Sequence, residues 1–73
     1  NTQLNVDINS PKAGLVQIKL MDATGRVVRA IDMQVQAGYN KTDLNMEGLA
    51  DGVYMIKVSN NKGLNFSQTI RKN

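Results

Sequence analysis

The feature that most constrains the fold of this chain is a two-residue alternation of apolar and polar side chains. It appears at residues 4–8 and recurs at residues 16–20, 31–35, 54–58 and 64–70. Successive side chains of a β-strand point to opposite faces, so this period predicts strands that each bury one face. No useful length of sequence shows the 3.6-residue period of an amphipathic helix. The alternation therefore predicts an all-β protein.

Turn-forming segments separate these strands and indicate how they are arranged. The expected strands are residues 4–9, 16–21, 26–36, 41–46, 53–59 and 64–71. The doublet Val27-Val28 breaks the alternation, so we expect a β-bulge just after Gly25. Strands of this length, with turns every roughly 8–12 residues, are typical of antiparallel sandwiches. We predict one domain over residues 1–73, a small antiparallel Ig-like β-sandwich of six to seven strands, with a small barrel as the alternative.

Several residues are expected to shape the turns. Asp22 and Gly25 bracket a tight hairpin turn, where Asp22 can bond its own backbone and Gly25 can adopt a positive φ. Gly38 lies in a turn expected at residues 37–40, and Gly63 closes the loop before the last strand. These positions are predicted to serve the fold.

The segment that runs from Leu49 to Tyr54 has a structural interpretation of its own. Leu49 is the only large apolar residue of its loop, and Gly52 lets the chain turn sharply into the next strand. Tyr54 is expected on the buried face, with its hydroxyl bonded to a loop carbonyl, as in the tyrosine corner of Ig-like sandwiches. Val53 and Met55 then lie on the other face, where they are either covered or form an exposed apolar strip.

The residue types offer little for catalysis or metal binding. Histidine and cysteine are absent, which removes the commonest general base, the commonest neutral metal ligand and any thiolate site. Asp43, Glu47 and Asp51 could be considered for calcium, but turn roles for Asp43 and Asp51 are the preferred interpretation. We predict a non-catalytic domain without cofactor or metal.

The charge of the chain is mildly basic and scattered. Nine Lys and Arg stand against six Asp and Glu, which gives a net charge of +3. With only three aromatic residues, this composition favours a soluble surface over a nucleic-acid footprint. No segment approaches the roughly 20 apolar residues of a membrane-spanning helix.

Read in order, several elements resemble a known family. They are the turn from Asp22 to Gly25, the element Leu49-x-x-Gly52-Val-Tyr54, and the basic pair Arg71-Lys72. Together they are similar to the type A C-terminal sorting domain of proteins that Bacteroidetes bacteria export through the type IX secretion system. The similarity covers nearly all of the chain, and the Leu-x-x-Gly-Val-Tyr element is its most specific part.

The resemblance implies a sorting signal and not an enzyme. It implies passage through the periplasm, recognition by the outer-membrane translocon and its shuttle protein, and arrival at the cell surface or outside the cell. A sortase-type cysteine protease is implied to cut upstream of the domain. The family's signal positions match Gly52, Tyr54, Lys57, Arg71 and Lys72. For Gly52 and Tyr54 we favour a role in folding over a role in the signal. For the three cations we favour contact with a partner.

Three further expectations complete the interpretation of the sequence. Family members usually open with a Pro-Asn-Pro-type segment that this chain lacks, which implies that the piece begins inside the domain or just past its first strand. An accessory carbohydrate-binding or adhesion module is the alternative function, with Tyr39 in a turn as the candidate for stacking on a sugar. A spacer that self-associates through Val53 and Met55 is the third.

Overall fold

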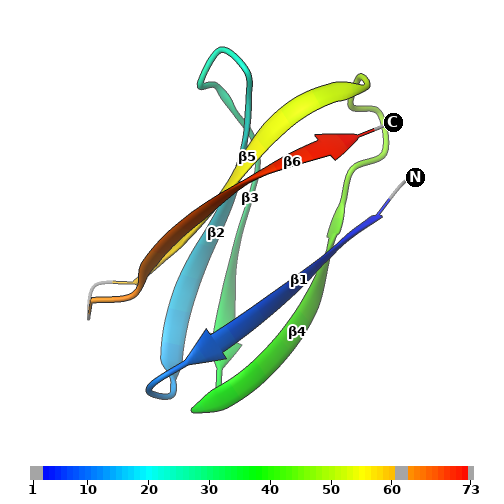
Figure 1. Ribbon diagram of the computed structural model, residues 1–73. Coiled ribbons are helices and arrows are strands. Elements are labelled where there is room, and N and C mark those ends of the chain that lie inside the picture. Colours follow the sequence, from blue (N-terminus) through cyan, green and yellow to red (C-terminus); the bar gives the residue numbers. More distant parts are fainter. Residues whose placement is uncertain (1–2, 61–62, 73) are drawn as a thin grey trace.

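The computed structural model describes residues 3–60 and 63–72, and these residues form β-strands and turns (Figure 1). The strands are β1 (Gln3–Ser10), β2 (Gly14–Asp22), β3 (Val27–Val35), β4 (Gly38–Asn45), β5 (Gly52–Ser59) and β6 (Asn65–Lys72). Within the described ranges, no helix is long and apolar enough to cross a membrane. The predicted all-β class is confirmed.

The strands form two antiparallel sheets of unequal size. β1 pairs with β4 in a two-stranded sheet, and the other four strands form a second sheet in the order β3-β2-β5-β6. Figure 1 shows the β1-β4 ribbon packed across one face of the larger sheet, with the start of β1 and the end of β6 at the same end of the molecule. This two-layer arrangement confirms the sandwich, and the barrel alternative is wrong because the described strands do not close into one sheet.

The core lies between the two sheets and is built from the alternating positions. The buried apolar residues are Val6, Ile8, Val16, Ile18, Leu20, Val35, Leu44, Met46, Tyr54, Ile56 and Val58. Burial of each large side chain contributes about 1.5–3 kcal/mol. Because β2 and β5 are the central pair of the larger sheet, their inward side chains are covered most completely, and Ile18, Leu20 and Val58 have no exposed surface.

The passage from β3 to β4 differs from the prediction. A turn was expected at residues 37–40 and a strand at residues 41–46, but β4 already begins at Gly38. The side chain of Asn40 explains the difference, since its Nδ2 donates to the Gln36 carbonyl at 2.8 Å and its Oδ1 accepts from the Gln36 amide at 2.9 Å. One side chain thus closes the corner, and the chain changes sheets within two residues.

Two irregularities shape the rim of the sandwich. The expected bulge is present on β3, where Val27 pairs with Met21 and Arg29 with Leu20, so that Val28 is the extra residue. At the opposite edge, Phe66 of β6 shares the inward face with its partner Val58 but remains 40% exposed. The two-stranded sheet covers the centre of the larger sheet and leaves β6 only partly covered.

Candidate functional site

The start of β5 forms a compact corner. Gly52 has φ +152°, a conformation that side-chain-bearing residues rarely adopt. Two residues later the ring of Tyr54 enters the core with 6% of its surface exposed, and its hydroxyl donates to the Ala50 carbonyl at 2.5 Å. Leu49 packs against the same core from the loop. The predicted tyrosine corner is confirmed, so Leu49, Gly52 and Tyr54 each have a role in folding.

The three expected cationic contact residues do not share one surface. Lys57 pairs with Ser67 and Arg71 with Val53, and these positions lie on the outer face of the four-stranded sheet. Lys72 pairs with Gly52 and therefore turns toward the inner side, where only 13% of its side chain is exposed and its Nζ lies 3.4 Å from Asp51 Oδ1. Arg71 and Lys72 therefore present their charges on opposite sides of the sheet, because neighbouring residues of a strand face opposite ways.

The outer face of β5 carries the apolar strip that the sequence left undecided. Val53 is 46% exposed and Met55 is 43% exposed, so the described chain does not cover them. Met55 lies opposite Met21 of β2, and Lys57 lies opposite Lys19. Sequence reasoning missed Lys19 and Met21 because nothing local shows that β2 and β5 pair across the intervening strands.

The hairpin turn between β2 and β3 is held by one carboxylate. Asp22 Oδ1 accepts from the Thr24 hydroxyl at 2.5 Å and from the amides of Thr24 at 2.9 Å and Arg26 at 3.1 Å. The Thr24 hydroxyl foremost, with these amides and the Arg26 charge, holds the pKa of the Asp22 carboxyl below its ordinary value. Gly25 completes the turn at φ +90°. The predicted structural roles of Asp22 and Gly25 are confirmed.

The other two glycines of interest also adopt positive φ. Gly38 has φ +101° at the first position of β4, and Gly63 has φ +99° before β6. The hairpin loop expected at residues 60–63 is closed by Asn60, whose amide donates to the Leu64 carbonyl at 3.0 Å and whose side chain accepts from the Leu64 amide. Residues 61–62 of that loop lie outside the described residues.

The side chain of Arg29, which sequence reasoning did not single out, ties the two sheets together at one end. Its Nε donates to the Asn45 carbonyl at 3.1 Å, and its Nη2 donates to the Glu47 carbonyl at 2.7 Å. A third bond joins Nη1 to the Val28 carbonyl at 2.8 Å, beside the bulge. Only the folded sandwich brings this arginine of β3 to the end of β4.

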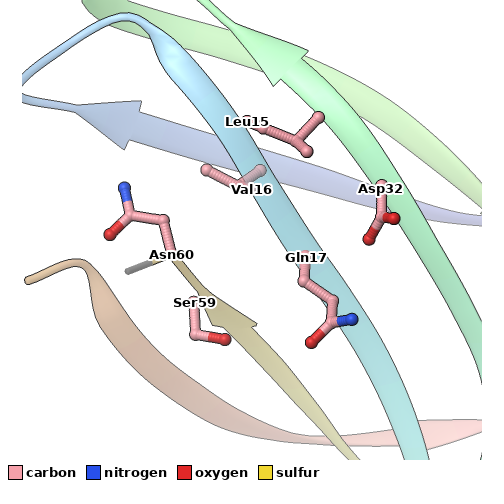
Figure 2. A pocket seen from close by; sticks show the side chains of 6 residues that line it. All are labelled: Leu15, Val16, Gln17, Asp32, Ser59 and Asn60. Carbon is pink, nitrogen blue, oxygen red and sulfur yellow. The ribbon is translucent and has the colours of Figure 1, made fainter. Parts of the chain in front are cut away.

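The residue considered for carbohydrate binding, Tyr39, is exposed but does not lie where it was expected. Tyr39 lies within β4 and not in a turn, and its hydroxyl donates to Asp7 Oδ1 at 2.8 Å, which raises the pKa of the Tyr39 phenol. A surface hollow of about 440 Å³ lies elsewhere, at the ends of β2 and β5 (Figure 2). Its lining residues are Leu15, Val16, Gln17, Asp32, Ser59 and Asn60, and none of them is aromatic.

The acidic residues considered for calcium are dispersed. Asp43 is an exposed residue of β4, so its expected turn role is wrong, whereas Asp51 lies at the bend before β5. Within residues 3–60 and 63–72, no group of three or more His, Cys, Asp or Glu side chains could hold a metal ion. The main features that the structure describes are therefore the Tyr54 corner, the Asp22 turn and the exposed outer face of the four-stranded sheet.

A family comparison decides the identity of this sandwich. The family described as the secretion system C-terminal sorting domain matches residues 1–72. The chain belongs to this family. A sorting domain of this kind is the C-terminal signal of cargo of the type IX secretion system in Bacteroidetes, and it sends its cargo to the cell surface or out of the cell. No curated protein and no solved structure matches the chain.

Membership in the family indicates that exposed residues of the sorting domain are candidates for contact with the secretion system. The type IX secretion system, which exports cargo across the outer membrane, recognises such domains, and a sorting signal is typically non-catalytic. Side chains on the outside of the folded sandwich are the ones open to contact with another protein. The corner at Gly52 and Tyr54 is largely internal, whereas Lys57 and Arg71 are available on the outer face.

Proposed function

We propose that the sorting domain is read at the outer membrane, after transit through the periplasm, by the translocon and its shuttle protein. The match of the family over residues 1–72 carries the proposal. Lys57 and Arg71 contact the partner directly from the outer face. Gly52 and Tyr54 contribute by fixing the start of β5, and Lys72 contributes by holding the end of β6 near Asp51.

A sortase-type cysteine protease then separates the domain from its cargo by cutting ahead of residue 1. Cleavage upstream leaves the sandwich intact, which suits a signal that is read as a folded unit. Replacing the protease nucleophile should leave a cargo that retains the domain after export, as an immunoblot of surface proteins would show. Normal removal of the domain in that strain would refute this step.

The domain is also proposed to include one strand upstream of residue 1, paired with the edge of β1 that faces away from β4. Two observations support it. β1 bonds only to β4 among the described strands, and a groove of about 220 Å³ separates it from β6, with Leu4, Phe66 and Ile70 along its walls. A chain extended by its native upstream residues should show slower hydrogen exchange at the β1 edge amides. Unchanged exchange would count against the extra strand.

A secretion assay tests the proposed function itself. Residues 1–73, with the native upstream segment, are fused to a reporter in a bacterium that has a type IX system. We expect the reporter to reach the surface or the medium, and deletion of residues 70–73 to retain it inside the cell. Because this deletion also shortens β6, the variant Arg71→Glu serves as a second measurement, since it changes only an exposed side chain. Normal export of both variants would refute the role of this segment.

A further inference from the structure

The outer face of the four-stranded sheet carries an apolar band that crosses three strands. Val27 of β3, Met21 of β2 and Met55 of β5 lie side by side, since Met21 pairs with both neighbours. Val53 extends the band along β5, and its exposure matches that of Val27 at 46%. Met21, Val53 and Met55 line a depression of about 300 Å³, and the Asp22 carboxylate at its edge is bound within its own turn by Thr24 and Arg26. Exposed apolar surface of this kind, rimmed by polar residues, marks interaction sites.

Cations lie next to the band on β2, β5 and β6. Lys19 and Lys57 lie directly opposite each other on β2 and β5, and Arg71 lies opposite Val53 on β6. The described residues place no carboxylate within ion-pair distance of any of the three, since the two ion pairs found there are Arg26–Asp22 and Lys72–Asp51. Like charges directly opposite on neighbouring strands destabilise a sheet. The Lys19–Lys57 pair is therefore expected to weaken the isolated fold and to favour an anionic partner.

We propose that this outer patch, formed by Met21, Val27, Val53 and Met55 with Lys19, Lys57 and Arg71, docks an acidic amphipathic segment of a protein. One apolar side chain of that segment fills the depression, and its neighbouring carboxylates bind Lys19 and Lys57. Charge complementarity and the apolar recess together define this partner. The inference rests on the proposed function, because the segment belongs to the protein that recognises the sorting domain.

Two other occupants fit the patch less well. A second copy of the chain would bring its own lysines against Lys19 and Lys57, and this repulsion opposes a symmetric dimer. A membrane surface would be expected to meet aromatic side chains at the interface. The exposed aromatic residues, Tyr39 and Phe66, lie instead on the two-stranded sheet and on the inward side of β6.

The variant Lys57→Glu separates docking from folding. The new carboxylate would face Lys19 and replace repulsion by attraction, so the melting temperature should rise by about 2–4 °C. The same change places a negative charge where the partner presents its own, so export of the reporter should fall roughly tenfold. Lys12→Glu is the matched control, because Lys12 is exposed in the β1–β2 loop and the change alters the net charge equally.

The outcomes distinguish this inference from the proposed function. If the unaltered fusion is not exported, the proposed function fails. If it is exported, and Lys57→Glu is exported as well as Lys12→Glu, the docking inference alone is overturned. A gain of stability together with a loss of export supports it.

A photoreactive side chain at position 55 identifies the occupant in the secreting cell. Position 43 on β4 is the control, since Asp43 is also exposed but lies on the other sheet. We expect a crosslink from position 55 to a protein peptide that carries several carboxylates around an apolar residue, and its loss when Lys57→Glu is added. A crosslink to lipopolysaccharide, to a second copy, or to a peptide without carboxylates overturns the inference. The absence of any crosslink from an exported fusion also overturns it.

Discussion

Replacing Tyr54 by phenylalanine removes one oxygen atom from the corner and leaves the buried ring in place. The hydroxyl donates to the Ala50 carbonyl at 2.5 Å, and that bond is lost. Ala50 itself is exposed, so water can reach its carbonyl and limit the penalty of an unpaired acceptor. The expected cost is therefore that of one net hydrogen bond, about 1 kcal/mol.

This loss is large enough to measure in a domain of this size. A chain of 73 residues is expected to have a free energy of unfolding of about 4–11 kcal/mol. A change of about 1 kcal/mol lowers the melting temperature by roughly 4–8 °C. Urea unfolding should show a lower midpoint with an unchanged slope, because the surface exposed on unfolding is the same. Replacement by alanine removes the ring too and should cost about 3–5 kcal/mol, as for other large aromatic residues.

The chain offers a matched control in its other tyrosine. Tyr39 is 68% exposed, and its hydroxyl bonds to Asp7 on the solvent side of the two-stranded sheet. Tyr39→Phe makes the same chemical change and should leave the urea midpoint unchanged. If Tyr54→Phe is as stable as the unaltered domain, or if both variants lose stability equally, the assignment of a folding role to the corner is refuted.

Three further substitutions test other parts of the structure. Gly52→Ala forces a side chain into a conformation that glycine adopts readily and should cost roughly 1–3 kcal/mol in urea unfolding, and an unaffected midpoint would contradict the φ of +152°. Arg29→Met removes the bonds to the Asn45 and Glu47 carbonyls and should cost roughly 1–3 kcal/mol, whereas an equal loss in the exposed control Arg26→Met would refute the link. Asp22→Asn should be less stable than the parent at neutral pH, and the difference should vanish in acid. The lowered pKa of Asp22 means that its carboxylate stabilises the fold above its ordinary pKa and loses that effect as the pH falls through the lowered value. A pH-independent difference between the urea midpoints would refute this assignment.

Local patterns in the sequence were sufficient for the strands and for the corner. A period of two depends only on which side chains can be buried together, so it located the five strands β1, β2, β3, β5 and β6 and the inward face of β5, whereas β4 was placed too late in the chain. The hydrogen bond of the Tyr54 hydroxyl was predictable because a buried polar group needs a partner and the nearest loop supplies a carbonyl. The prediction of a turn at residues 37–40 was wrong. The composition Gly-Tyr-Asn is typical of turns, but here the Asn40 side chain closes a shorter corner and lets β4 begin at Gly38.

The candidate recognition surface was beyond local patterns for a different reason. Lys19 and Lys57 become neighbours only because β2 pairs with β5, and Phe66 is exposed only because the facing sheet has two described strands. Lys72 faces inward because it pairs with Gly52, and a shift of the β5–β6 register by one residue would turn it outward. Such facts are properties of sheet order and register, which follow from the packing of distant segments.

Because the inner face of the four-stranded sheet builds the core and the outer face is exposed, variants of the two faces should differ in how their export relates to their stability. A variant of the inner face, such as Tyr54→Phe, can affect export only by lowering the fraction of folded signal, so its export should follow its stability. Lys57 faces solvent and opposes Lys19, so Lys57→Glu is expected to raise stability while it lowers export. No single relation between stability and export can accommodate both variants. A plot in which Lys57→Glu falls on the curve set by the inner-face variants would mean that the secretion system responds to the folded sandwich alone, and the outer face would then have no part in recognition.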